Sequence, residues 1–194
     1  MQRGFTLIEM VMVITLSSGI MLILSGLLVF FYRTNASIIE QTGAITSARR
    51  GIENAMRDLR ETTYAETGAY PIEYISENEI IFYADTDTDD AVEKITYKLI
   101  DDTFYKHVVN PTGNPYEYVE AGATTTISTE VRNTQFARDV FTYFNANGDE
   151  VAADSSPLEV TFITASIVVN VNPDRAPNEF TLTSSATLRN LRPN

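Results

Sequence analysis

Residues 5 to 32 read FTLIEMVMVITLSSGIMLILSGLLVFFY, and Glu9 is the only charged side chain among them. The 23 uncharged residues from Met10 to Tyr32 would form about 35 Å of helix, enough to cross the ~30 Å hydrocarbon core of a bilayer. The run is too long for the core of an ordinary signal peptide, and no clear Ala-x-Ala site follows it. The stretch therefore predicts a transmembrane helix over residues 5–32, and a plain single-span anchor is the simplest interpretation.

Glu9 needs an explanation that a plain anchor does not supply. An unpaired carboxylate in hydrocarbon costs about 2.5–3.5 kcal/mol on insertion scales, and such residues are usually partnered. The partner must be a cation, and Arg3 is a poor candidate. Cleavage after Gly4 would free a positively charged α-amine on Phe5, four residues and so about one helical turn from Glu9. Gly4 and Phe5 thus form a candidate processing site, and Glu9 a candidate assembly residue.

The string from Arg3 to Met10, RGFTLIEM, resembles the processing site of type IV prepilins and type II secretion pseudopilins. The resemblance implies that residues 1–4 are a leader, removed by a prepilin peptidase that then methylates Phe5. It also implies a single-pass protein of the cytoplasmic (inner) membrane with an extracytoplasmic C-terminal domain. The implied partners are other minor and major pilins or pseudopilins and an inner-membrane assembly platform. Basic residues flank both ends of the span, so the positive-inside rule does not decide the orientation.

Helical periodicity continues beyond the membrane span. Ile38, Ile45, Ile52 and Leu59 recur every seven residues and form one apolar stripe. Gly68 is a suitable C-terminal cap, and Pro71 follows it. The pattern predicts an amphipathic continuation over residues 33–68, with the helix ending near Thr67.

Residues 69–194 have the pattern of an antiparallel β domain. Strands are predicted over 80–83, 93–99 and 104–109 as a meander, and Asn147-Gly148 predicts a tight hairpin after residues 140–144. Two long strands, 163–171 and 180–188, close the chain, whereas 124–138 is predicted as a short helix or irregular segment. The expected fold class is α+β, with the C-terminal half of a long N-terminal transmembrane helix packed on an antiparallel sheet, which is a pilin-like layout.

This order of elements resembles the J-type minor pseudopilins and the W-type minor pilins. The matching stretches are 58–61, 82–85 and 141–144, and the absence of a proline near Gly26 favours a minor subunit. The resemblance implies a structural subunit at the tip, or in the initiation complex, of a type II secretion pseudopilus. A minor pilin of a type IV or competence pilus, and a plain membrane-anchored binding module, are the alternatives.

Composition argues against enzymes and nucleic-acid binding. His107 is the only histidine, and cysteine is absent. The sequence therefore offers few residues for a histidine-activated nucleophile or for a Cys/His metal site. The net charge of −12 would repel nucleic acid backbones. We expect no enzymatic activity, no nucleic-acid partner and no organic cofactor.

One metal site is conceivable, and it is made of oxygen ligands. Asp85, Asp87 and Asp89 alternate along the chain, with Asp90 and Glu93 nearby, and carboxylates are Ca²⁺ ligands. The segment is not an EF-hand, because its sixth position is Asp90 instead of glycine and its twelfth lacks glutamate. A solvated hairpin tip is the alternative interpretation.

Overall fold

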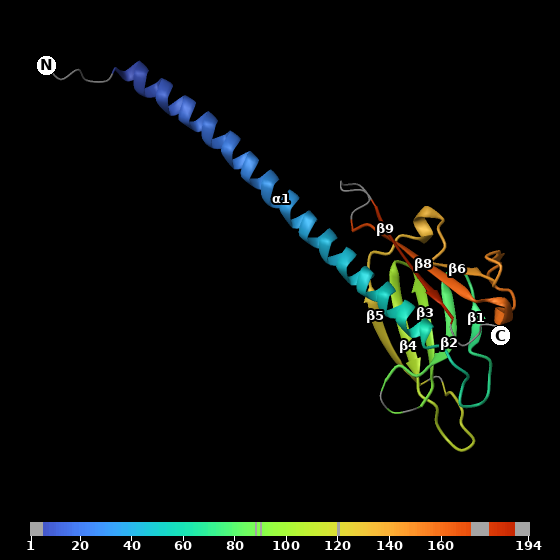
Figure 1. The fold of residues 1–194 in the computed structure, drawn as a ribbon. Coiled ribbons are helices and arrows are strands. Elements are labelled where there is room, and N and C mark those ends of the chain that lie inside the picture. The colour runs from blue at the N-terminus through green and yellow to red at the C-terminus, as the bar shows by residue number, and fades with distance from the viewer. Residues whose placement is uncertain (1–5, 88, 90, 120, 172–178, 189–194) are drawn as a thin grey trace. The chain divides into compact units, whose positions relative to one another are not determined.

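The computed structural model describes residues 6–87, 89, 91–119, 121–171 and 179–188, and it has an α+β layout (Figure 1). A long helix, α1 (Leu7–Arg60), precedes all the strands. The chain divides into two compact units, residues 1–40 and 41–194, with the boundary inside α1.

The first unit is the part of α1 up to Glu40. Its described side chains are all exposed except that of Ser37, which is half-buried. The exposed set includes every large apolar residue from Leu7 to Tyr32. This part of the helix therefore has no apolar core within its own unit.

The second unit begins with the rest of α1, which is buried on one side only. Buried positions recur every three or four residues, at Gln41, Ala48, Gly51, Ile52, Ala55, Met56, Asp58 and Leu59. This spacing is that of one helix face, so the predicted stripe is confirmed from Ile45 onward, whereas Ile38 is exposed.

The predicted helix end near Thr67 is wrong, because α1 ends at Arg60. Thr62 already pairs with Ala84 as an isolated β-bridge, and the Thr63 amide donates to the Tyr83 carbonyl at 2.9 Å. The helix therefore ends early because the next residues pair with a strand that is distant in sequence. Gly68 does adopt a left-handed φ of 79°, but it closes a later turn by donating to the Ala65 carbonyl.

The first sheet has five antiparallel strands in sequence order. They are β1 (Ile72–Ile75), β2 (Glu79–Ala84), β3 (Glu93–Ile100), β4 (Thr103–Val109) and β5 (Ala123–Ser128). The meander β2-β3-β4 is confirmed. The prediction for 124–138 is wrong at its start, where β5 forms, and right later, where a short 3-10 helix, η1 (Thr134–Phe136), lies. Most of β5 is exposed, so it lacks the alternation that marks a half-buried strand.

The second sheet has the strand order β7-β6-β8-β9. Its strands are β6 (Phe141–Phe144), β7 (Glu150–Val151), β8 (Phe162–Val169) and β9 (Phe180–Thr187), with the 3-10 helix η2 (Pro157–Glu159) before β8. The predicted hairpin between β6 and β7 is confirmed, with Gly148 at a φ of 87° where only glycine is unstrained.

Both sheets and the second part of α1 share one hydrophobic core. A chain of aromatic rings crosses it, with successive centroids 6.2, 5.7, 6.2 and 6.4 Å apart. The rings belong to Phe82, Tyr97, Phe104, Phe141 and Tyr143. Because the first three come from one sheet and the last two from the other, these contacts join the two sheets.

A buried polar cluster fixes α1 to the first sheet. The Asp58 carboxylate accepts a hydrogen bond from the Tyr97 hydroxyl at 2.7 Å and pairs with the Lys106 ammonium at 2.6 Å. Burial, followed by the neighbouring Asp58 charge, raises the pKa of Tyr97, so its hydroxyl stays protonated and donates. A buried charge is tolerated when it is paired in this way.

Gln41 makes the equivalent contact near the start of the second unit. Its side-chain amide donates to the Val169 carbonyl at 3.3 Å, and its oxygen accepts from the Val171 amide at 3.0 Å. The side chain thereby takes the place of a neighbouring strand at the end of β8.

Candidate functional site

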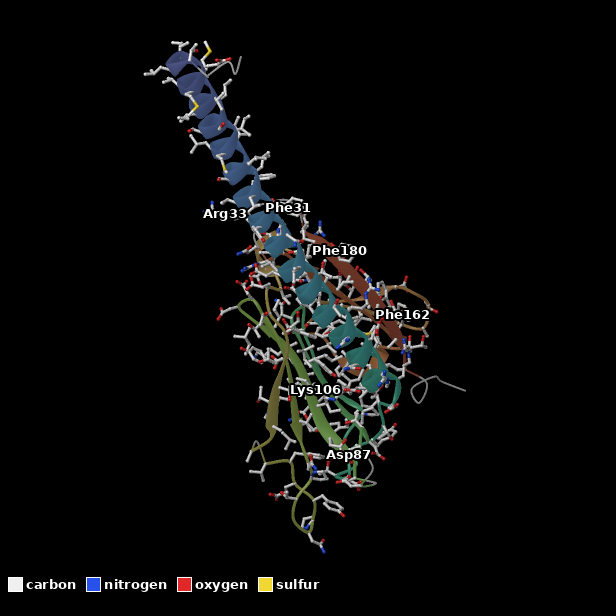
Figure 2. All side chains as sticks on the ribbon, turned by 90° about the vertical axis from the view of Figure 1, so that its left-hand side faces the viewer. Phe31, Arg33, Asp87, Lys106, Phe162 and Phe180 are labelled. Atoms are coloured by element: carbon white, nitrogen blue, oxygen red, sulfur yellow. The ribbon has the colours of Figure 1, made fainter. Side chains whose placement is uncertain are left out.

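The apolar segment of α1 is the first candidate site. In the part of the chain that the structure describes, α1 is the one helix long and apolar enough, by length and composition, to cross a membrane. Side chains project from it on all sides, and Phe31 and Arg33 mark the end of the apolar run (Figure 2). Phe31 is 73% exposed. Apolar surface of this extent is covered in a working protein by lipid or by other helices.

Three hydroxyl groups inside this segment are satisfied by the helix itself. Thr15, Ser17 and Ser18 each donate to the carbonyl four residues earlier, over 2.6 Å for Ser17 and 2.7 Å for Ser18. A hydroxyl bonded in this way leaves no unmet donor in hydrocarbon. These three hydroxyl side chains are therefore compatible with a membrane location.

Glu9 lies in the first turn of α1 and bonds to the residue that precedes the helix. Its Oε2 atom accepts from the Thr6 amide and from the Thr6 hydroxyl, both at 3.4 Å. This is half of a capping box, in which an acid three residues into the helix binds the N-cap amide. This role was not predicted for Glu9, although Thr-x-x-Glu before an apolar run is its signature. Gly4 and Phe5 lie outside the described residues, so the predicted pairing of Glu9 with an amine stays a prediction.

The second candidate site is acidic and lies between β2 and β3. One carboxylate oxygen from each of Asp85, Asp87 and Glu93 lies within 4.8 Å of the other two. Asp89 is not part of this trio, and its Oδ1 atom accepts from the Ala91 amide at 3.0 Å in a local turn. Asp90 lies outside the described residues. Glu93, which was predicted only to lie nearby, is thus brought into the cluster by strand pairing.

Glu93 is the buried member of the trio and is 1% exposed. Its Oε2 atom accepts from the Thr86 amide at 2.9 Å and from the Thr86 hydroxyl at 3.2 Å. Its Oε1 atom is buried and has no hydrogen-bond partner among the described residues, and the same is true of Asp85 Oδ1. Burial raises the pKa of Glu93, and the neighbouring Asp87 and Asp89 charges raise it further, against the lowering effect of the Thr86 bonds.

His107 lies on the outer surface of the first sheet. Its Nδ1 atom is 2.8 Å from the Thr124 hydroxyl, and it lines a groove of about 430 Å³ together with Lys94, Lys98 and Tyr105. Lys94 is paired with Glu73, and Lys98 with Glu79. The side-chain hydrogen bond of His107 is therefore made with a hydroxyl and not with a carboxylate.

No protein-family model matches the chain, and comparison with curated proteins found no significant match. The function is therefore argued from the residues of the two sites.

Proposed function

We propose that this protein is a minor pilin-like subunit, cleaved after Gly4 and methylated on Phe5, that assembles at the tip of a type II secretion pseudopilus. The observation that carries the proposal is Glu9, the single carboxylate in an apolar helical segment whose side chains are exposed all round. The proposed subunit is a structural component and not an enzyme. Its acidic β domain would face outward, toward other minor subunits.

The energetics of the segment favour assembly over simple anchoring. Its apolar surface can be covered by lipid alone, but a carboxylate in lipid has no counter-ion. The amine of Phe5 from a neighbouring subunit would neutralise Glu9 while the apolar helices bundle. Pairing the two charges offsets desolvation that either would suffer alone, and it fixes the axial register of one helix against the next.

The local bonds of Glu9 are compatible with such a partner. Both reach the same oxygen, Oε2, and at 3.4 Å they are long. Within the described residues, the second carboxylate oxygen is therefore left for an amine. Capping of the helix and pairing with a cation are nevertheless different roles, and one substitution separates them.

Glu9→Gln is the decisive variant. Glutamine keeps an oxygen that can accept from the Thr6 amide, so the cap survives, but it carries no charge. If charge pairing drives assembly, Glu9→Gln and Glu9→Ala both insert into the membrane and both lose crosslinks to partner subunits. Thr6→Ala removes the hydroxyl contact but leaves the charge, and it should keep most of the crosslinking. Normal crosslinking of Glu9→Gln would show that Glu9 acts only as a cap.

Mass spectrometry of the membrane-extracted protein tests the processing step. Loss of Met1 to Gly4 together with the gain of one methyl group is expected. An intact Met1 would remove the basis of the proposal.

A membrane-anchored binding module is the second candidate, and the buried acid at the β2–β3 loop favours it. It would keep its first four residues and would not crosslink to pilin-like subunits. A minor pilin of a type IV or competence pilus would share the processing and the Glu9 dependence. Retraction or DNA-uptake defects in a deletion strain, in place of a secretion defect, would identify that case.

A further inference from the structure

The β2–β3 loop holds an acidic cluster whose position is fixed by the ends of two paired strands. Ala84 and Glu93 are the last paired residues of the β2–β3 ladder, so Glu93 is the first residue of β3 and Asp85 directly follows the last residue of β2. Tyr118, from another loop, holds the residue before β3 in place, because its hydroxyl donates to the Val92 carbonyl at 2.7 Å. Its ring also packs on Tyr83, with the centroids 5.1 Å apart. Two of the three acids are therefore attached to strand ends that tertiary contacts hold in place.

Glu93 distinguishes this cluster from an ordinary acidic surface. An acid at a hairpin tip normally keeps its oxygens in water, whereas Glu93 is 1% exposed and its Oε1 atom has no partner among the described residues. Asp85 Oδ1 is a second buried oxygen in the same state. Buried polar atoms in native proteins are nearly always bonded, so both atoms require a partner that protein groups of the described chain do not provide.

The charge of the cluster indicates what that partner is. Among the described residues, no Lys, Arg or His forms an ion pair with Asp85, Asp87 or Glu93. Three carboxylates whose oxygens lie within 4.8 Å of one another repel each other in a site that water reaches only partly. A cation placed among them would remove the repulsion and bond to the unpartnered oxygens.

We infer that Asp85, Asp87 and Glu93 bind one Ca²⁺ ion per chain. Two oxygens bound to the same Ca²⁺ at 2.3–2.6 Å can be at most about 5.2 Å apart, and the three oxygens meet that limit. The trio contains only oxygen donors, which suits a hard cation and not zinc. Calcium fits better than magnesium, because it accepts several carboxylates in irregular geometry, whereas magnesium usually keeps most of its water.

The local turns of the loop leave this trio available. Asp87 uses Oδ1 to accept from the Asp89 amide at 2.9 Å, which leaves its second oxygen for the ion. Asp87 is exposed, so the ion can enter from solvent beside it (Figure 2). Water molecules would complete the six to eight ligands that calcium takes.

The test is calorimetric titration of CaCl₂ into the full-length protein in detergent micelles, after removal of divalent ions with EGTA. One saturable site per chain is expected, and the thermal midpoint should rise with Ca²⁺ concentration because the ion binds only the folded state. Glu93→Gln and Asp87→Asn should each weaken binding at least about tenfold, as loss of a ligand exceeds the loss of a supporting contact. The same titration with MgCl₂ should give weaker binding.

Asp149→Asn is the matched control. It removes the same charge from the other acidic tip, where Asp149 bonds to the Asn145 side chain, and it should bind Ca²⁺ like the unchanged protein. If circular dichroism shows that Glu93→Gln is unfolded, the exposed Asp87→Asn variant decides the outcome. No saturable binding at millimolar Ca²⁺, or equal binding by Asp87→Asn, would overturn the site. The result is independent of processing after Gly4, so it leaves the proposed function untouched.

Discussion

Two parts of α1 have the same backbone conformation and opposite surroundings. From Leu7 to Glu40 the apolar side chains are exposed on every side, and residues such as Leu24 and Phe30 contact no core within their own unit. From Gln41 to Arg60 only one face is buried, and Glu53 and Arg57 stand on the exposed side. The difference shows that helix formation and helix burial are separate problems. The apolar surface of the first part is not covered within its own unit, whereas the second part buries its apolar face against the two sheets.

The largest expected difference is between two leucine-to-alanine variants, one in each part of α1. Leu59 is fully buried in the shared core, so Leu59→Ala should lower the free energy of unfolding of the second unit by about 2–5 kcal/mol. Leu24→Ala should leave that unfolding unchanged, because Leu24 lies in the first unit. Thermal melts of the full chain in detergent, followed by tyrosine near-ultraviolet circular dichroism, measure both. Equal effects of the two variants would contradict the division of the helix.

The next largest effect concerns charged residues on the buried and the exposed face of α1 from Gln41 to Arg60. Asp58→Ala leaves the Lys106 ammonium and the Tyr97 hydroxyl without their common partner, and it should cost about 2–4 kcal/mol. Glu53→Ala, on the exposed face one turn earlier, is the control and should change the melt little. Asp58→Ala with the stability of the unchanged protein would show that the pair contributes nothing.

A smaller effect separates two glycines of the same helix. A Cβ at Gly51 would lie 2.1 Å from Ile127 Cγ2, whereas one at Gly43 would meet nothing within 4 Å. Gly51→Ala should therefore destabilise by about 1–2 kcal/mol, since the clash exceeds the gain in helix propensity. Gly43→Ala should stabilise by about 0.5–1 kcal/mol, because alanine favours the helix. If both variants were stabilised, α1 would not approach β5 as closely as the structure shows.

The smallest effect is one of pH. Burial raises the pKa of Tyr97 above the ordinary value near 10. The folded state then holds its proton where the unfolded state has lost it, so the associated stability is complete below pH 10 and is lost as pH rises above it. Tyr97→Phe should cost about 1 kcal/mol at pH 7 and should show a shallower loss of melting temperature above pH 10. Part of the fall in melting temperature above pH 10 should remain in Tyr97→Phe, because burial also raises the pKa of Tyr143. An unchanged slope would show that Tyr97 does not titrate with unfolding.

Local patterns predicted most of the fold correctly. The apolar run, the seven-residue stripe from Ile45 and the Asn-Gly turn each depend on neighbours within a few residues, and each formed as expected. The end of α1 was misplaced because pairing of Thr62 with Ala84 outweighed the cap signal at Gly68. Strand β5 was missed because its exposed threonines carry no alternation, and its pairing with β4 holds it in the sheet.

The acidic site shows the same limit at the level of single atoms. Alternation of Asp85, Asp87 and Asp89 indicated an oxygen-rich loop, but chain order cannot say which carboxylates converge. Strand pairing opposite Ala84 placed Glu93 in the cluster, and Asp89 does not belong to it. The capping role of Glu9 is the reverse case, since its Thr-x-x-Glu signature was readable without any structure.

The sequence by itself determined that a helix apolar enough to cross a membrane precedes the strands, that one carboxylate interrupts its apolar run, and that a β domain follows. Hydropathy, charge and turn propensity are properties of short segments, so they can be read from the sequence without knowledge of distant contacts. Only the tertiary structure decided where the helix stops, that two sheets share one core, and that Glu93 is buried beside Asp85. Those outcomes depend on pairing between residues far apart in the chain, where packing and strand hydrogen bonds outweigh local preference.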